Sequence, residues 1–183
     1  MSVRVHLVRH GRAAAGWGED RDPGLDEVGR AQAAELATQV SGIGPMAVLS
    51  SPFQRAQQTA APLAERWGVE PVLEPMVGEI PSPTEDLAER SAWLRDALRS
   101  RWADLGATVI EWRARLLATL LGLPTDTVVF THFVAINAVV GAAGDDAALI
   151  VFAPANASHT VIDIRAGELS LVQLGRQADS AVT

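Results

Sequence analysis

The chain has 183 residues, a length typical of one compact domain, and we predict a single domain over residues 1–183. Hydrophobic residues make up 48% and charged residues 20%, which is the composition of a globular protein and excludes a disordered chain. The net charge of −7 argues against a general nucleic-acid-binding surface. Because the chain has no cysteine, disulfides, thiolate catalysis and cysteine-bound metals are excluded.

The N-terminal segment lacks the features of a targeting sequence. Arg4, His6 and Arg9 interrupt its apolar residues, so we do not expect a signal peptide. No apolar stretch approaches the roughly 20 residues that a membrane span needs. We therefore expect a cytoplasmic protein that binds neither membranes nor nucleic acids. The sequence carries no signal of the oligomeric state.

Strand and helix patterns alternate through the first half of the chain. Residues 3–8 predict a strand that ends at the Arg9-His10-Gly11 turn, and 12–24 has the composition of a loop. A helix follows, with Asp26 as its predicted N-cap and an inner face formed by Val28, Leu36 and Val40. A short strand over 46–49, a strongly periodic helix over 53–67 that Gly68 ends, and a brief strand at 72–73 come next.

The second half continues the alternation. We predict two helices between residues 84 and 121 that are separated near Gly106, the first of them marked by Leu87, Leu94, Leu98, Trp102 and Leu105. A strand at 128–130 and a helix over 133–143 follow. The remaining predicted strands cover 149–153, 160–164 and 168–174. This order predicts an α/β fold, a three-layer α/β/α sandwich with a mainly parallel central sheet.

Two histidines follow predicted strands. Ligands of such sheets bind outside the carboxyl ends of the strands, so His10 and His132 are expected to meet there. A neutral imidazole can attack phosphorus, and an arginine such as Arg9 can bind two phosphate oxygens. Arg55 lies in the first turn of a helix, where backbone amides also favour an anion. No single one of these residues identifies a phosphate site, because each could instead be a structural or a solvated side chain.

In their order along the chain, five segments together resemble the histidine phosphatase superfamily, also called phosphoglycerate mutase-like. They are Leu7-Val8-Arg9-His10-Gly11-Arg12, Gly24-Leu25-Asp26-Glu27-Val28-Gly29-Arg30-Ala31-Gln32-Ala33, Leu49-Ser50-Ser51-Pro52-Phe53-Gln54-Arg55-Ala56-Gln57-Gln58-Thr59-Ala60, Gly78-Glu79-Ile80 and Thr131-His132-Phe133. The resemblance extends from residue 5 to about 174. Its most specific parts are the Arg-His-Gly turn and the stretch around Arg55, and the segment at Glu79 matches most loosely.

The resemblance implies a phosphoglycerate mutase-like fold with a short helical lid at about 80–107. It further implies that His10 attacks phosphorus and becomes a phosphohistidine, while Arg9, Arg55 and His132 bind the phosphate. Glu79 would be the general acid and then the base, with Glu85 and Asp86 as the nearest replacements. No metal ion and no cofactor are expected.

The sequence also departs from the pattern of family mutases. Gly16 stands where mutases have Asn, Phe133 follows the second histidine in place of Gly, and Asn137 stands where an Arg is frequent. Because a cation set for a glycerate carboxylate is also missing, we predict a metal-independent phosphomonoester phosphatase acting on a small or moderately sized phosphorylated substrate. Alternatives are a protein phosphohistidine phosphatase, whose small members usually lack the acid, a phosphoglycerate mutase activity, and a non-catalytic phosphate-binding regulatory protein.

Residues outside the core motif are candidates for other roles. We expect substrate contacts from Arg12, Trp17, Ser82 and Asn137. His6 lies within the first predicted strand and is expected to be a core histidine. His159 is expected to be structural or solvated.

Overall fold

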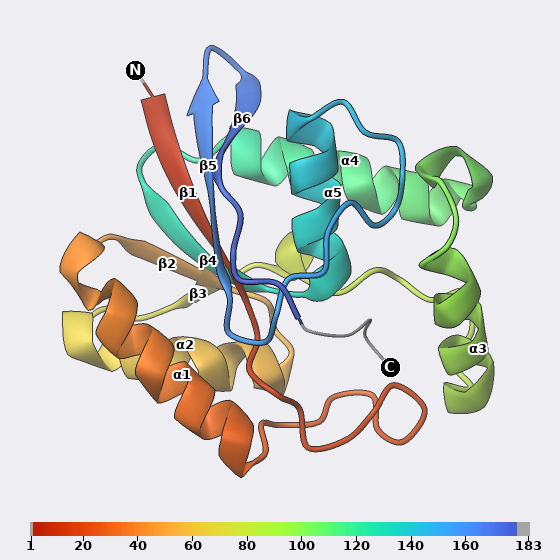
Figure 1. Cartoon of the computed structure of the whole chain (residues 1–183), viewed down its shortest axis with the longest axis horizontal. Helices are drawn as coiled ribbons and strands as arrows, with labels where there is room; N and C mark the ends of the chain where they lie inside the picture. The colour runs from red at the N-terminus through yellow and green to blue at the C-terminus, as the bar shows by residue number, and fades with distance from the viewer. Residues whose placement is uncertain (1, 179–183) are drawn as a thin grey trace.

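A computed structural model describes residues 2–178, and its centre is a six-stranded sheet (Figure 1). The strands are β1 (Ser2–Arg9), β2 (Ala47–Ser50), β3 (Val72–Leu73), β4 (Thr127–Thr131), β5 (His159–Arg165) and β6 (Glu168–Gln173). They lie in the order β3-β2-β4-β1-β5-β6; the first four are parallel, β5 runs antiparallel to β1, and β6 runs antiparallel to β5 and thus in the direction of the first four. The predicted mainly parallel sheet is therefore confirmed.

Helices cover both faces of the sheet, as a three-layer sandwich requires (Figure 1). The helices are α1 (Glu27–Val40), α2 (Gln54–Trp67), α3 (Leu87–Ala97), α4 (Ala107–Leu121) and α5 (Phe133–Ala143). α1 and α2 pack on one face over a core that includes Val8, Leu63 and Phe130. α4 and α5 cover the other face, while α3 lies at the edge of the molecule, away from the sheet (Figure 1).

Local signals in the sequence explain several helix ends. Asp26 caps α1 by accepting a hydrogen bond from the Gly29 amide at 2.7 Å, as predicted. Gly68 ends α2 with a φ of 65°, a left-handed conformation that glycine adopts without steric cost. α5 covers the predicted range 133–143.

The segment 149–153, which we predicted as a strand, is irregular, and that prediction was wrong. Its backbone amides find an acceptor on α5 instead of on a neighbouring strand. The Asn137 side-chain oxygen accepts hydrogen bonds from Val151 N at 2.8 Å and from Phe152 N at 3.1 Å. Since these buried donors are already satisfied, the apolar segment packs without joining the sheet.

Two helical predictions also need correction. Val28 is 43% exposed, because Gly29, one position further along α1, is the residue that faces inward. The first helix of the 84–121 region ends at Ala97, before three of its predicted markers. Of these, Trp102 begins a separate 3₁₀ helix, Trp102–Asp104, where its backbone amide donates to Ala147 O at 3.1 Å.

The single domain predicted over 1–183 stays a prediction, and residues 1 and 179–183 lie outside the described part. Within residues 2–178, none of the helices combines the length and the apolar character needed to cross a membrane.

Candidate active site

Strand register brings the two predicted histidines together. In the parallel pair β1–β4, Arg9 lies opposite Thr131, so the next residues, His10 and His132, emerge side by side at the carboxyl edge of the sheet. Their ring centroids are 5.2 Å apart. β2 also pairs with β4, which places Ser51 at the same edge. The expectation that two histidines distant in sequence meet here is confirmed.

The His10 ring is held in one tautomer. Its Nδ1 lies 2.7 Å from the backbone oxygen of Gly11, which can only accept a hydrogen bond, so Nδ1 carries the proton and Nε2 keeps its lone pair. Burial lowers the pKa of His10 well below its usual value, and the charges of Arg55 and Arg9 add to the shift. His10 is therefore a neutral imidazole with a free nucleophilic nitrogen at neutral pH.

Two buried guanidinium groups flank this imidazole. Arg9 donates from Nη1 to the Pro154 carbonyl at 2.8 Å, and its Cζ lies 5.0 Å from the centre of the Phe133 ring. Arg55, in the first turn of α2, stacks its Cζ 4.6 Å from the centre of the Phe53 ring. Burial lowers the pKa of Arg9 to about 10, so the group still keeps its charge near neutral pH.

Both arginines leave nitrogen atoms for a ligand. Arg9 Nε and Arg55 Nη1 are buried and have no hydrogen-bond partner among the described residues. Unpaired buried donors are costly, and an oxyanion between the two guanidinium groups would satisfy them. The nearest carboxylate to Arg55 is that of Asp22, whose Oδ1 is 3.8 Å from Arg55 Nη1 and also accepts from Gln54 N at 2.7 Å.

His132 and Glu79 form a neutral contact in the floor of the site. His132 Nδ1 is 3.6 Å from Glu79 Oε2, and His132 Nε2 is 2.7 Å from Ser51 Oγ. Burial lowers the pKa of His132 well below its usual value and raises the pKa of Glu79. Both shifts favour the uncharged forms of the pair, whereas the hydrogen bond from Ile80 N to Glu79 Oε1 at 3.1 Å favours the carboxylate.

Close backbone packing fixes the turn that carries His10. A Cβ on Gly11 would lie 2.6 Å from the Gly29 carbonyl oxygen. A Cβ on Gly29 would lie 2.1 Å from the Arg12 carbonyl oxygen. Glycine is therefore required at both positions by contact between the turn and α1, not by an unusual φ. Thr59 on α2 completes the support, because its hydroxyl accepts from Gly11 N at 2.9 Å and donates to Arg55 O at 2.6 Å.

The comparisons with known proteins agree with this geometry. The sequence profile of the histidine phosphatase superfamily (branch 1) matches residues 5–177. The chain belongs to this superfamily. The solved structures similar to this chain include phosphatases.

Individual relatives match only part of this superfamily member. An uncharacterized protein of Mycobacterium tuberculosis, Rv0525, is 46% identical over 68 residues, which cover 35% of this chain and 34% of that protein. A 2,3-bisphosphoglycerate-dependent phosphoglycerate mutase of Methylobacterium radiotolerans is 34% identical over 116 residues, 58% of this chain and 51% of the mutase. The matched regions thus span between a third and a half of these relatives.

Solved structures share the fold of this chain over nearly its whole length. Phosphoserine phosphatase from Entamoeba histolytica, in complex with 3-phosphoglyceric acid, has a TM-score of 0.73 at 21% identity and covers 96% of this chain and 98% of its own. Mycobacterial glucosyl-3-phosphoglycerate phosphatase has a TM-score of 0.67 at 22% identity, with coverages of 97% and 100%. The predicted phosphoglycerate mutase-like fold is confirmed.

The three candidate acids lie in different surroundings. Glu79 is buried beside His132, whereas Glu85 is exposed and pairs with Arg21. Asp86 caps α3 by accepting from Glu89 N at 2.9 Å. Of the three carboxyl groups, only that of Glu79 contacts the two-histidine site within residues 2–178.

The four residues predicted to contact the substrate lie in different surroundings. Asn137 is fully buried, and its amide bonds Phe133 O in addition to the two amides of segment 149–153, so it holds the fold and is withdrawn as a substrate contact. Arg12 pairs with Asp26 at 2.5 Å near the start of α1. Ser82 bonds the Thr84 carbonyl in its own turn, and Trp17 is half-buried, with its carbonyl accepting from Arg90. Contacts of these three with a substrate stay predictions.

One cation near the site was missed in the sequence. Arg90 lies on α3, 73 residues from Trp17, to whose carbonyl it donates at 3.3 Å. Its charge lowers the pKa of Arg55, of Glu79 and of His132, so it lies within electrostatic range of the site. Nothing in the local sequence around Arg90 distinguishes it from Arg95, the other arginine of that helix, and only the fold brings it near the site.

Within residues 2–178 there is no group of three or more histidines and carboxylates placed to hold a metal ion. The metal-free mechanism remains a prediction. His6, expected to be a core histidine, and His159, expected to be structural or solvated, lie on neighbouring strands, where His6 Nδ1 is 2.7 Å from His159 Nε2 and the ring centroids are 5.0 Å apart.

Proposed function

We propose that this protein is a phosphomonoester phosphatase that works through a phosphohistidine at His10. The observation that carries the proposal is the neutral His10 ring, held by Gly11 O with its Nε2 free, beside two buried guanidinium groups and a second imidazole. A nucleophile, an oxyanion cradle and a protonated acid are the three parts that phosphoryl transfer needs.

The first chemical step transfers the phosphoryl group to the protein. The lone pair of His10 Nε2 attacks phosphorus and the bond between phosphorus and the ester oxygen breaks. Arg9, Arg55 and His132 stabilise charge on the phosphoryl oxygens, where a loose transition state concentrates it. Glu79, whose pKa burial raises, reacts in its protonated form, gives its proton to the departing alkoxide and becomes a carboxylate.

The second step hydrolyses the phosphohistidine. The Glu79 carboxylate takes a proton from water, and the resulting hydroxide oxygen bonds to phosphorus as the P–N bond breaks. His10 recovers its lone pair, Glu79 is again protonated, and inorganic phosphate leaves. No oxidant, metal or further co-reactant is needed to balance either step.

Arg90 favours substrates that carry a second anionic group. A third guanidinium group near the site exceeds what one phosphate needs, and it comes from α3, in the segment predicted as a lid. Structures of similar fold include a phosphatase in complex with 3-phosphoglyceric acid, a phosphate ester with a carboxylate. We therefore propose a small phosphomonoester with a carboxylate or second phosphate as the substrate class.

Transfer of a radiolabelled phosphoryl group tests this function directly. The wild-type protein, quenched rapidly with a labelled phosphomonoester in the presence of a chelator, should carry an acid-labile label on residue 10. His10→Ala should lose both the label and turnover of 4-nitrophenyl phosphate. His159→Gln is the matched control, a histidine on the neighbouring strand that should label normally. A label that persists in His10→Ala, or that lies on another side chain, would overturn the mechanism.

A further inference from the structure

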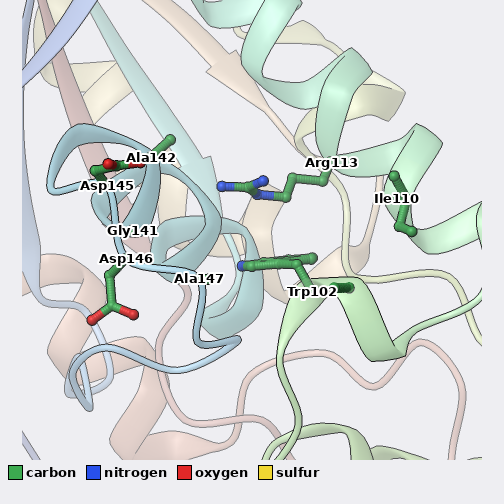
Figure 2. Close-up of a pocket in the computed structure, with 9 residues that line it drawn as sticks. Trp102, Ile110, Arg113, Gly141, Ala142, Asp145, Asp146 and Ala147 are labelled. Carbon is green, nitrogen blue, oxygen red and sulfur yellow. The ribbon is translucent and has the colours of Figure 1, made fainter.

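A second pocket lies away from the histidine site, between the 3₁₀ helix at Trp102 and the end of α5 (Figure 2). Its volume is about 360 Å³, enough for a small metabolite. One wall comes from the 3₁₀ helix and α4, and the other from the end of α5 and the turn after it. The lining residues are Trp102, Ala103, Ile110, Arg113, Gly141, Ala142, Asp145, Asp146 and Ala147.

The first wall offers two unpaired hydrogen-bond donors. Arg113 stacks its guanidinium over the Trp102 ring at 4.9 Å from the ring centre. Trp102 is only 5% exposed, and neither its Nε1 nor Arg113 Nε has a partner among the described residues. In Figure 2 the nitrogens of both side chains are turned toward the turn that carries Ala147. The two buried donors, Arg113 Nε and Trp102 Nε1, lie on stacked side chains, and one of them is charged. They could donate hydrogen bonds to the two oxygens of a carboxylate.

The opposite wall is negative. Asp145 and Asp146 are both exposed at the pocket and lie on the side opposite Arg113 in Figure 2, where Asp146 Oδ1 accepts a hydrogen bond from Ala148 N at 2.9 Å. The C-terminal turn of α5, at Gly141, adds the negative end of a helix dipole. These charges disfavour a dianion such as phosphate and favour a cationic group on the ligand.

We propose that this pocket binds a small zwitterion, with its carboxylate on Arg113 and Trp102 and its ammonium group facing Asp145 and Asp146. The cationic and anionic walls face each other across a cavity of about 360 Å³, so the two charges of the ligand are separated by several bonds. An ω-amino acid or a basic amino acid has this arrangement, whereas a simple α-amino acid carries its charges close together.

The pocket is distinct from the histidine site. α5 begins directly after His132 and ends at the pocket, and its 11 residues span about 16 Å. None of the lining residues belongs to the set proposed for phosphoryl transfer. Binding in this pocket therefore does not depend on whether the phosphatase function proves correct.

Calorimetric titration of the full chain with matched probes tests the proposal. 6-Aminohexanoate has both charges, hexanoate only the carboxylate, and hexylamine only the ammonium group. We expect 6-aminohexanoate to bind at least about tenfold more tightly than either single-charge probe, because each lacks one wall. Glycine, with its charges adjacent, should bind more weakly than 6-aminohexanoate. Equal affinities for hexanoate and 6-aminohexanoate, or no binding of any probe, would overturn the proposal.

Variants on each wall provide an independent check. Arg113→Gln and Trp102→Phe should each weaken 6-aminohexanoate binding by about tenfold, and phenylalanine keeps an aromatic ring in the core. Arg115→Gln is the matched control, since Arg115 is an exposed α4 residue that pairs with Glu111 at 2.6 Å. The double variant of Asp145→Asn with Asp146→Asn should remove the preference over hexanoate. Unchanged binding in Arg113→Gln with an unchanged melting temperature would contradict the site.

Discussion

At the scale of single residues, burial moves the acid and the nucleophile in opposite directions. The pKa of His10 falls and that of Glu79 rises, so each shift favours the uncharged form that the proposed role of the group requires. The opposite shifts share one physical cause, the removal of water from both groups. Arg9 and Arg55 strengthen the shift of His10 but oppose that of Glu79, so a bound phosphate, which offsets their charge, would raise the pKa of Glu79 further.

Replacing Glu79 by Gln should damage reactions that need an acid most. For alkyl phosphates we expect kcat to fall by roughly 10²–10⁴, the usual contribution of a general acid. For 4-nitrophenyl phosphate, whose leaving group departs without a proton, the fall in the first step should be much smaller. Wild-type activity on alkyl phosphates should also decline as pH rises through the raised pKa of Glu79, and this limb should disappear in the variant.

Glu85→Gln and Asp86→Asn are the controls for this measurement. Glu85 pairs with Arg21 at the surface and Asp86 caps α3, so neither change should alter the dependence on the leaving group. If Glu79→Gln lost the same factor on both kinds of substrate while one of these two lost activity selectively, the acid would have to be reassigned.

At the scale of elements, α3 supplies a cation that a phosphate alone does not need. Arg90→Ala should raise KM by about tenfold for phosphomonoesters that carry a carboxylate, because one charge-assisted hydrogen bond is lost. KM for 4-nitrophenyl phosphate should change by less than about threefold. Arg95→Ala is the matched control, an exposed arginine of the same helix that bonds Ser91 at 3.2 Å. Equal increases in KM for both substrates would assign Arg90 to general charge, not to specificity.

The other element-scale prediction concerns segment 149–153. Asn137→Ala removes the acceptor of the Val151 and Phe152 amides and should lower the free energy of unfolding by about 3 kcal/mol. Urea denaturation measures this change. Gln39→Ala, which removes an exposed amide that bonds only Glu35 on α1, should stay within about 0.5 kcal/mol of the wild type. A similarly small loss in Asn137→Ala would show that water replaces the side chain.

Elements with local signals were predictable from the sequence, and the misplaced ones depend on distant partners. The α1 cap at Asp26 and the end of α2 at Gly68 lie within a few residues of the structure they determine. Segment 149–153 is apolar enough for a strand, yet a side chain on α5 decides its conformation. Arg90 was missed for the same reason, because its position near Glu79 follows from the packing of α3 and the 12–24 loop.

At the scale of the whole molecule, all four histidines share one response to acid. Burial is the first cause of a lowered pKa for His6, His10, His132 and His159, and for His159 the value is about 4. The unfolded chain therefore binds more protons than the folded one below pH 6.5, so stability falls as pH falls. Glu79, with a raised pKa, acts in the opposite direction, but it is one group against four.

The pair of His6 and His159 allows this response to be measured without touching the proposed active site. A pKa of about 4 for His159 corresponds to a loss of about 2 kcal/mol between pH 7.5 and pH 5. Around the pair, Arg4 lowers the pKa of His6 further, while Asp126 and Asp163 raise it. His159→Gln removes one titrating ring, so urea denaturation at the two pH values should show a loss smaller by about 2 kcal/mol than in the wild type. If His159→Gln lost as much free energy of unfolding between the two pH values as the wild type, the His6–His159 pair would have to open and accept protons in the folded state.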